Sequence, residues 1–352
     1  MSIDKTDHRH WRNREWLLSP DVPETLIKAA KKLEEKEKQL REHFFVEDLN
    51  EYICEVFANN LSASYAIEGE QLNSSIVKSS IIRQMNFDLP VWTPKYSSGQ
   101  REVEATAMAL SFLNMDELTH EMIVDAHAKL SDIHFSGRYR QGDEEEIIRS
   151  GKEIVYYAPS PYLVHGLMDD FLDWWNDDRK NLPAIIGSAI GHSIFVIIHP
   201  FGDGNGRVSR ALSDKAMITG NETIFRPYSL STFILRNRDN YYKSLQSVKQ
   251  TPFITFMLDV YDKALNDGFE KARLLQFSRY FSGRFDFSEN ERRAIRKIIL
   301  SQKPYWEFSD FEDIPNQEEI WESLRSHNII TDAGEFDAEW RPKTKTEPVF
   351  RP

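Results

Sequence analysis

The sequence has few of the features that would mark a disulfide-rich, zinc-thiolate or membrane protein. Its 352 residues include one cysteine, Cys54, so neither a disulfide framework nor a cysteine-based metal site is available. A single cysteine suits a reducing compartment, and we expect a cytoplasmic protein. The apolar stretch at residues 189–198 is interrupted by glycine, histidine and serine and is much shorter than the roughly 18 apolar residues of a membrane span. We therefore expect a buried helix there and no membrane association.

The sequence also has fewer basic than acidic residues. The chain has 44 Lys and Arg residues against 56 Asp and Glu, a net charge of −12. A general nucleic-acid binder is usually basic, so we do not expect a nucleic-acid partner, although one local basic site could still bind ATP. The first ten residues are polar and lack the apolar run of a signal peptide. With 40% hydrophobic and 28% charged residues, the composition is that of an ordinary globular protein with two or three domains.

Helical periodicity covers most of the chain. It predicts helices at residues 22–43, 46–67, from 74 onward, 101–113, 119–133, 162–176, 183–198, 238–248, 253–275, 289–301 and 316–327. Two β-prone runs within 145–157 surround Ser150-Gly-Lys and predict a hairpin. The Pro- and Ser-containing stretch 88–99 predicts a linker. The expected domains are an N-terminal helical region (1–95), a catalytic core (96–280) and a C-terminal module (285–352).

The C-terminal module follows the order helix, helix, then a turn between extended runs near 328–337. This order resembles a winged helix. Because the segment is net acidic, we expect a packing or partner-binding role for it in preference to DNA binding.

Residues 199–210 read His-Pro-Phe-Gly-Asp-Gly-Asn-Gly-Arg-Val-Ser-Arg and combine several residue types used in phosphate chemistry. Gly204 and Gly206 let the backbone turn and approach a ligand closely. If a helix begins here, its N-terminus adds free N–H donors and a partial positive charge, which bind anions. Arg207 and Arg210 are three residues apart on one helical face, where they can clamp phosphates.

Two further side chains of this loop are suited to chemistry. Asp203 offers a hard oxygen ligand of the kind that Mg²⁺ binds, and His199 can accept a proton near neutral pH. Taken singly, these features have ordinary explanations: a glycine-rich turn, surface arginines in ion pairs and a packed histidine. Their concentration in one short loop after an apolar helix favours a catalytic phosphate site, with Phe201 as the anchor of the loop in the core.

The loop matches the Fic family signature, His-x-Phe-x-Asp/Glu-Gly-Asn-Gly-Arg-x-x-Arg, at every specified position, and the resemblance extends over roughly residues 46–265. Gly137-Arg-Tyr-Arg140 and the hairpin near 147–157 resemble the entry to the Fic core and its target-docking flap. Residues 237–245 resemble the helix with two tyrosines that closes the nucleotide pocket. Some family members have Asn seven residues after the second tyrosine, whereas this chain has Lys249.

The resemblance implies a mainly α fold: a Fic helical core with a short β-hairpin flap, an N-terminal helical region and a C-terminal winged-helix-like module. It implies a protein adenylyltransferase that transfers AMP from ATP to Ser, Thr or Tyr hydroxyls of target proteins. His199 would deprotonate the hydroxyl, and Asp203 would hold Mg²⁺ or Mn²⁺. The residues implied to bind ATP are Gly204, Asn205, Gly206, Arg207, Arg210 and Tyr242.

A second, shorter motif lies upstream. Ser64-Tyr-Ala-Ile-Glu-Gly69 matches the Fic inhibitory motif, Ser/Thr-x-x-x-Glu-Gly/Asn, although a helix end with a solvated glutamate would also give this pattern. In the family the glutamate, here Glu68, pairs with the second motif arginine, here Arg210, and occupies space that the γ-phosphate needs. The resemblance therefore implies an enzyme that is inhibited by its own N-terminal helix, with Ser64 and Glu68 as the inhibitory residues.

The hairpin is implied to be the site of target docking. Ile147, Ile148, Ile154 and Val155 would form the flap, and a free strand edge could pair with a target segment through backbone hydrogen bonds. Such pairing reads little sequence; an ordinary structural hairpin is the alternative. We expect a protein partner, and self-modification and a homodimer are both open.

Two alternatives to AMP transfer are open. Fic relatives also transfer other phosphate-containing groups, transfer a phosphate or remove AMP. Gly204 and Gly206 lack the Gly-to-Lys change of the phosphorylating relatives, and both motif arginines are present, which favours AMP transfer. A protein of another class, regulatory and binding DNA or a partner through its C-terminal module, is the second alternative.

Overall fold

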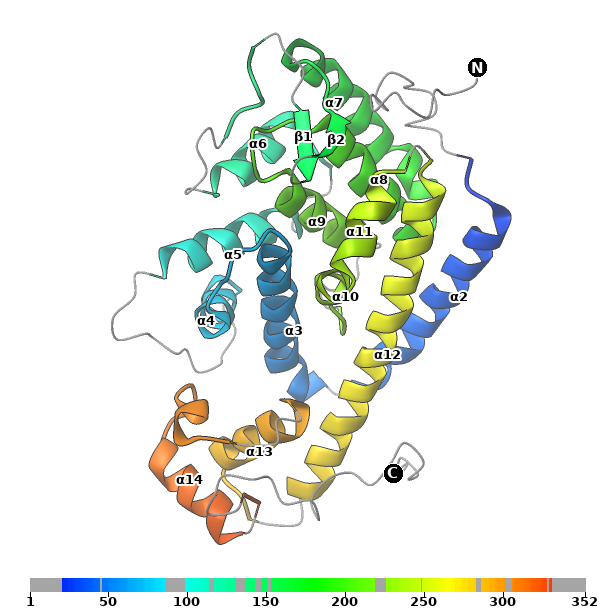
Figure 1. The fold of residues 1–352 in the computed structure, drawn as a ribbon. Coiled ribbons are helices and arrows are strands. Elements are labelled where there is room, and N and C mark those ends of the chain that lie inside the picture. Colours follow the sequence, from blue (N-terminus) through cyan, green and yellow to red (C-terminus); the bar gives the residue numbers. More distant parts are fainter. Residues whose placement is uncertain are drawn as a thin grey trace.

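Helices make up almost all of the regular structure (Figure 1). The computed structural model describes residues 21–44, 46–85, 99–113, 117–130, 137–142, 147–150, 153–218, 226–247, 249–282, 286–301, 306–327 and 329–330. Its helices are α2 (Glu24–Arg41), α3 (Val46–Ile67), α4 (Ser74–Gln84), α5 (Gln100–Leu113), α6 (His120–Ala128), α7 (Pro161–Asn176), α8 (Ala184–Ile198), α9 (Asn205–Ala216), α10 (Leu230–Arg236), α11 (Arg238–Leu245), α12 (Thr251–Ser282), α13 (Glu289–Ser301) and α14 (Gln317–Ser326), with short 3₁₀ turns η2 (Asp178–Asn181) and η3 (Phe308–Phe311). The mainly α fold is thus confirmed.

Most helix positions follow from the hydrophobic pattern, with three exceptions. The predicted helix 253–275 is longer than expected, because α12 runs from Thr251 to Ser282. The predicted helix 119–133 is shorter than expected: α6 begins after Thr119, whose hydroxyl accepts the Met122 N–H, and ends at Ala128. Its last turn is closed by i→i+3 hydrogen bonds, such as Leu130 N–H to the His127 carbonyl. The pattern gives no sign of α10, because seven residues capped by Ser229 are too few to show a period.

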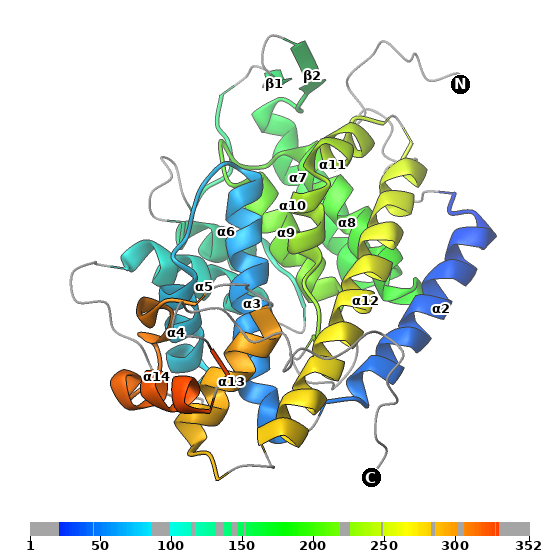
Figure 2. The same ribbon diagram turned by 60° about the horizontal axis from the view of Figure 1, so that its bottom comes forward.

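The β-hairpin is present where it is predicted. Strands β1 (Ile147–Ser150) and β2 (Glu153–Tyr157) pair antiparallel, with a bulge between Ile148 and Arg149. Figures 1 and 2 both show the hairpin at the opposite end of the molecule from α13 and α14. The expected linker at 88–99 and the expected wing near 328–337 lie almost entirely outside the described residues.

The main hydrophobic core is built around α8, which is buried along nearly its whole length. Helices α7, α9 and α12 pack directly against it, and the long α12 also runs beside α2 (Figures 1 and 2). Ala30, Leu40 and Tyr65 of the predicted N-terminal region belong to this same core. The N-terminal helices are therefore packed as part of the core that carries the 199–210 loop.

A second, smaller core serves the C-terminal helices. It joins α13, η3 and α14 to Tyr52 and Ile53 of α3 and to Leu274 and Leu275 near the end of α12. Because α12 continues to Ser282, one helix links the two cores without interruption. The start of α13 has a capping box: the Ser288 hydroxyl accepts the Glu291 N–H, and the Glu291 carboxylate accepts the Ser288 N–H.

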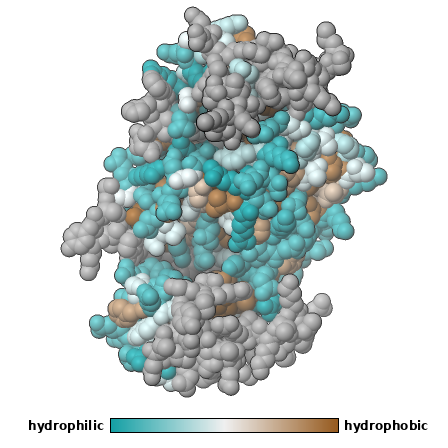
Figure 3. Space-filling model, viewed as in Figure 1, coloured by the Kyte–Doolittle hydropathy of each residue, from teal (hydrophilic) through white to brown (hydrophobic). Residues whose placement is uncertain are grey.

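The surface agrees with the polar composition. In Figure 3 the coloured part of the visible face is mainly hydrophilic, with apolar residues in small separate groups. Among the described residues, the exposed large hydrophobic side chains are Val103, Tyr162 and Phe308. None of the described helices is long and apolar enough to cross a membrane.

A buried carboxylate ties α2 to the core. Glu37 accepts hydrogen bonds from the Tyr228 hydroxyl at 2.9 Å and from the Tyr261 hydroxyl, and it pairs with Arg41 at 2.6 Å. Its side chain is 10% exposed. Burial, together with the Glu37 charge, raises the pKa of Tyr228 and of Tyr261, so both hydroxyls stay protonated and able to donate.

Glu37→Ala is expected to destabilise the protein by about 3–5 kcal/mol, because it leaves one cation and two buried hydroxyls without their acceptor. Urea unfolding followed by circular dichroism measures the change. Glu35→Ala is the matched control: its ion pair with Lys38 joins side chains that are 63% and 71% exposed, so its loss should cost less than ~0.5 kcal/mol. Equal destabilisation by the two variants would contradict this account of α2.

Candidate active site

The 199–210 loop connects two packed helices through two left-handed backbone positions. His199 ends α8 with φ 51° and ψ 58°, and its N–H still bonds to the Phe195 carbonyl. Gly204 has φ 81° and precedes the first residue of α9, Asn205. Only glycine adopts such a φ readily, which explains the residue type at this turn. A helix thus does begin directly after the glycine turn, as an anion site there requires, and Gly204, Asn205 and Gly206 at its N-terminus line a cavity.

Buried contacts fix the shape of the loop. The Asn205 amide accepts the Phe201 N–H at 3.0 Å and donates to the Phe201 carbonyl at 2.7 Å. Phe201 is fully buried, as the sequence predicts, and its ring stacks on His127 of α6 with 3.7 Å between centroids. Asn205 therefore acts as a clasp within the loop, and Phe201 anchors the loop to α6.

His127 is a positioning residue that the sequence does not single out. Its Nδ1 accepts the Gly137 N–H at 3.0 Å, so the proton is on Nε2, which donates to the Asp203 carbonyl at 2.9 Å. Burial lowers the pKa of His127, with the Arg207 charge acting in the same direction, and the ring stays neutral. One histidine thus links α6, the Gly137 turn and the loop.

Arg140 holds the start of the loop through the carbonyls of His199 and Pro200. Its Nε donates to the His199 carbonyl at 2.6 Å, its Nη2 to the Pro159 carbonyl at 2.8 Å, and its backbone N–H to the Pro200 carbonyl at 2.8 Å. Burial, and next the Arg140 charge, lowers the pKa of His199 to about 4. His199 is therefore a neutral imidazole at physiological pH, with a free lone pair for a proton.

A cavity of about 250 Å³ opens above this loop. Its lining is Glu68, Tyr156, Val196, Ile197, His199, Gly202, Asp203, Gly204, Asn205, Gly206, Arg207, Tyr241, Tyr242, Leu245 and Gln246. The structure thus brings together most of the predicted site residues, from the 199–210 loop, the end of α3 and α11. Arg210 and Ser64 lie behind Glu68 and do not line it. A larger hollow of about 520 Å³ lies between α3, α10 and α12, away from the loop.

The predicted pair of Glu68 and Arg210 is present. Arg210 is 2% exposed, and its Nη2 donates to Glu68 Oε1 and to the Ser64 carbonyl, each at 2.8 Å. Its Nε donates to the Ser64 hydroxyl at 2.8 Å. Burial is the largest single influence and lowers the pKa of Arg210, but Glu68 and Tyr241 together, through charge and hydrogen bonding, outweigh it and the pKa is raised. Whether this contact inhibits the protein remains a prediction.

A second carboxylate of the same segment, which the sequence motif does not include, holds the other arginine. Glu70 pairs with Arg207 Nη1 at 3.3 Å and also with Arg101 of α5. Arg207 is 2% exposed, lies over the Tyr65 ring at 5.3 Å and pairs with Asp203 at 3.3 Å. Each motif arginine is therefore matched with one glutamate from the turn that follows α3.

Some guanidinium N–H groups are nevertheless left without an acceptor. Within the described part of the chain, Arg207 Nε and Nη1 and Arg210 Nη1 are buried and make no hydrogen bond. A buried donor without a partner costs about 1–3 kcal/mol. These donors beside a helix N-terminus are suited to an anion with several oxygens, such as a phosphate.

A buried hydrogen-bond network that includes His192 lies next to the motif arginines. His192 of α8 bonds through Nδ1 to the Ser213 hydroxyl at 2.8 Å and through Nε2 to the Tyr241 hydroxyl at 2.9 Å. Burial, and next the Arg210 charge, lowers the pKa of His192 to about 3. The sequence shows His192 only as an interruption of an apolar run, whereas in the fold it orients Tyr241 at the cavity wall.

The hairpin approaches the same cavity. The Tyr156 hydroxyl of β2 donates to the Ile197 carbonyl, two residues before His199, and Tyr156 lines the cavity. The backbones of Ile147, Ile148, Ile154 and Val155 form part of the two paired strands. Tyr242 of α11 lines the cavity and donates to the Ile67 carbonyl at 3.3 Å, whereas Lys249 is exposed and does not line it.

Comparison with known proteins agrees with this geometry. Residues 117–217 match the Fic/DOC family. The chain is similar to a probable protein adenylyltransferase of Aquifex aeolicus (32% identity over 95 residues, 27% of each chain). It is also similar to protein adenylyltransferase fic-1 of Caenorhabditis elegans (30% over 192 residues, 51% of this chain and 34% of that one). A third relative is protein adenylyltransferase Fic of Nematostella vectensis (26% over 274 residues, 73% and 59%). The chain spans less than two thirds of the length of these relatives.

Solved structures show the same fold. A Fic family protein from Desulfovibrio desulfuricans G20 has a TM-score of 0.56 at 22% identity, covering 80% of this chain and 88% of that one. Fic-1 from Caenorhabditis elegans has a TM-score of 0.52 at 22% identity, covering 69% and 71%. With the helical core, the hairpin and the complete loop from His199 to Arg210 in place, residues 117–217 match the Fic/DOC family and the chain has the fold of Fic family proteins.

Proposed function

We propose that this protein transfers AMP from ATP to hydroxyl side chains of target proteins, and that Glu68 and Glu70 restrain the reaction. The observation that carries the proposal is the make-up of one cavity. A neutral His199, the N-terminus of α9 and Arg207 all face it, and beside it lie buried guanidinium N–H groups without acceptors. The names of the relatives, protein adenylyltransferases, support the same reaction.

The proposed reaction needs one base and several positive groups. His199 takes the proton of the target hydroxyl, and the oxygen forms a bond to the α-phosphorus of ATP. The bond from the α-phosphorus to the bridging oxygen breaks, and pyrophosphate leaves with the electron pair. Backbone N–H groups at Gly204, Asn205 and Gly206 would stabilise the charge that develops on the α-phosphate oxygens. Arg207 and Arg210 would bind the outer phosphates through the donors that have no acceptor at present and, for Arg210, also through the donor that Glu68 now holds.

Asp203 has the properties of a Mg²⁺ ligand. Its side chain is 67% exposed and lines the cavity, with one oxygen accepting the Gly204 N–H at 2.6 Å. Mg²⁺ usually keeps several waters and binds through one or two carboxylates plus substrate phosphates, which suits one exposed carboxylate at the cavity edge. The ion, or Mn²⁺, would neutralise charge on the leaving pyrophosphate. Asp203 itself would hold the ion, and the His127 hydrogen bond to its carbonyl keeps that part of the loop in position.

Tyr242 would close the nucleotide end of the cavity. Its ring lines the wall, and its hydroxyl donates to the Ile67 carbonyl at the end of α3. Lys249 does not line the cavity, so we assign it no part in binding the base.

The proposed protein substrate would dock on the hairpin. In the described residues β1 and β2 form a two-stranded sheet, so each strand has one edge that is not paired with the other strand. A target segment that adds to such an edge bonds through its backbone and brings a Ser, Thr or Tyr hydroxyl toward His199. Tyr156 fixes the hairpin to the end of α8, so the distance from the docked segment to the base is set by the fold. Flap-accessible hydroxyls of this chain would be modified in the same way.

Glu68 would restrain the reaction by position and by charge. A Cβ placed on Gly206 would clash with Glu68 Oε1, so this carboxylate packs directly against the N-terminus of α9. The cavity of about 250 Å³ is below the roughly 300–1,000 Å³ of typical small-molecule sites, and Glu68 forms part of its wall. A carboxylate there repels the phosphates and takes the Arg210 donors they would use.

Glu70 would restrain the reaction by neutralising Arg207, the first arginine of the motif, and would leave the cavity volume unchanged. It does not line the cavity, but it neutralises Arg207 from behind, with Arg101 as a further partner. When ATP binds Arg207, Glu70 would lose that ion pair but could keep its pair with Arg101. ATP would therefore have to displace Glu70 from Arg207 alone. We therefore expect Glu70 to restrain ATP binding less than Glu68 does.

His199→Ala, made in a Glu68→Gly background, is expected to lower AMP transfer by about 10²–10⁴-fold, because the base is lost. ATP affinity should change little, since His199 contacts the target and not the phosphates. Labelled AMP incorporation and isothermal titration with ATP measure the two quantities. His327→Ala, which removes an exposed histidine in α14's capping turn, is the control and should leave both unchanged. Retention of more than about a tenth of the activity by His199→Ala would exclude its role as base.

The pH profile provides a separate test of the base. Because the pKa of His199 is lowered, the competent neutral form persists below the ordinary value of about 6.5 and is lost only as the pH approaches 4. Glu68 raises this pKa, so its removal moves the acidic limb further down. We expect kcat/KM of Glu68→Gly to stay nearly constant from pH 7.5 to about 5.5. A half-maximal point at pH 6.5 or above, with unchanged circular dichroism, would contradict a buried neutral base.

Glu68→Gly is expected to raise AMP incorporation over wild type by about 5–150-fold or more. That range, about 5–150-fold, is usual for the coupling between two sites. Glu68→Asp should help little because the charge stays. Glu70→Gln should give a smaller gain, seen as a lower KM for ATP, and should add to the effect of Glu68→Gly because the two glutamates hold different arginines. Equal incorporation by wild type and Glu68→Gly would leave the Glu68–Arg210 pair a purely structural contact.

A further inference from the structure

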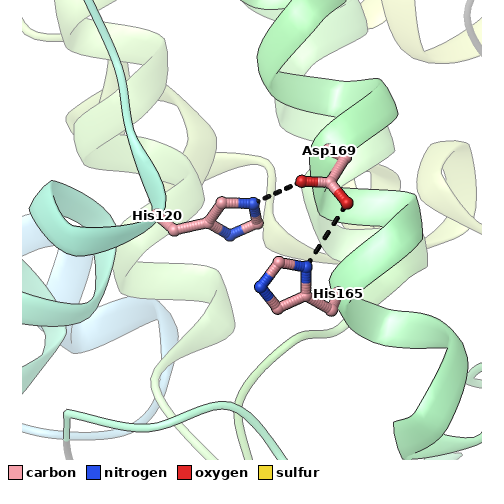
Figure 4. A group of neighbouring side chains, drawn as sticks. All are labelled: His120, His165 and Asp169. Atoms are coloured by element: carbon pink, nitrogen blue, oxygen red, sulfur yellow. Dashed lines mark hydrogen bonds and ion pairs between the residues drawn. The ribbon is translucent and has the colours of Figure 1, made fainter.

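Two helices near the hairpin end contribute a second group of ligand-type side chains (Figure 4). His120 is the first residue of α6, and His165 and Asp169 are one turn apart on α7. His120 Nε2 lies 2.8 Å from Asp169 Oδ1, and His165 Nδ1 lies 3.3 Å from Asp169 Oδ2. One ligand atom from each of the three residues lies within 4.8 Å of the others. None of the three lines the cavity above the 199–210 loop.

The donor set and its orientation suit a borderline divalent metal. Two imidazole nitrogens and one carboxylate oxygen favour Zn²⁺ over Mg²⁺, which prefers oxygen alone. His165 and Asp169 have the i, i+4 spacing that brings two side chains to one face of a helix. Figure 4 shows both rings directed at the same carboxylate, and the rings are stacked with 4.3 Å between centroids. Each imidazole therefore already presents one nitrogen to the Asp169 carboxylate, and the three ligand atoms are close together.

An outer contact supports the same assignment. His120 Nδ1 lies 2.9 Å from the Tyr139 hydroxyl. If Nε2 binds a metal, the proton must be on Nδ1, and Tyr139 is placed to accept it. Metal-binding histidines usually have such a partner on their second nitrogen, where it fixes the ring and the tautomer. Tyr139 in turn packs on Phe201 of the loop, with 5.3 Å between ring centroids.

We propose that His120, His165 and Asp169 form a Zn²⁺ site with water in the fourth position. The side chains are 27%, 70% and 57% exposed, so the ion can enter from solvent without a change of fold. The ion would join the start of α6 to the middle of α7. Through Tyr139 it would also brace the segment whose next residue, Arg140, holds the His199 carbonyl. It is separate from the ion that Asp203 would hold, and it does not depend on the proposed reaction.

The test is a Zn²⁺ titration of the chelator-treated full-length protein against a chromophoric competitor, with the metal content after dialysis as a second measurement. Wild type should bind one equivalent more than His165→Ala and than Asp169→Asn. His327→Ala is the matched control, because it removes an exposed histidine in the turn after α14, and it should keep the full stoichiometry. The segment His8-Arg-His10 is present in every variant, so any binding there cancels in the comparison.

Two further measurements separate a built site from casual binding. Tyr139→Phe keeps the aromatic ring but removes the acceptor for His120, and it should weaken Zn²⁺ binding by about 10–100-fold. Co²⁺ in place of Zn²⁺ should give the visible absorption of a four-coordinate ion in wild type but not in His165→Ala. Identical titrations of wild type and His165→Ala would overturn the proposal and leave the three residues as a hydrogen-bonded surface cluster. So would a Mg²⁺ affinity equal to that for Zn²⁺.

Discussion

The buried charge of Arg210 is the constraint on which the site depends. A guanidinium that is 2% exposed needs an anionic partner, because a buried charge without one costs several kcal/mol. In this structure Glu68 supplies that partner, with two more acceptors from Ser64. A phosphate could supply it equally well, but the two anions cannot occupy the same donors together. Under the proposed function, competition between Glu68 and a nucleotide would therefore follow from the electrostatics of Arg210 and would need no separate regulatory element.

The same constraint explains why the loop is so firmly held. A site that binds phosphates with backbone N–H groups works only if those groups stay in place when the ligand arrives, since their reorganisation would consume the binding energy. Asn205 clasps Phe201, His127 holds the Asp203 carbonyl, and Arg140 holds the His199 carbonyl. These three contacts come from three different segments, so the loop is fixed on several sides. Under the proposed function, the turn after α3 that carries Glu68 would move, while the loop would stay in place.

The sequence predicts the site correctly in this chain where the site residues are consecutive in the sequence. The 199–210 loop is contiguous, and glycine-rich turns followed by a helix have predictable geometry; Glu68 and Arg210 could be paired because each lies in a motif. Glu70, His127 and His192 could not be found, because their partners are far away in the sequence and no local pattern distinguishes them. The seven-residue α10 escapes for a different reason, as it is shorter than two periods of the pattern by which helices are detected.

The two glutamates differ in what their release would require. Glu68 is 31% exposed and packs on the start of α9, so moving it frees the Arg210 donors and cavity space together. Glu70 is 29% exposed and can keep its pair with Arg101 while giving up Arg207. A nucleotide would thus displace Glu70 at little cost, whereas displacing Glu68 means breaking a contact with a fully buried cation before the phosphate has replaced it. Under the proposed function, the barrier to activation would therefore lie at Glu68. Gly69, with φ 84° directly after it, has the backbone freedom that would let the chain turn away from α9.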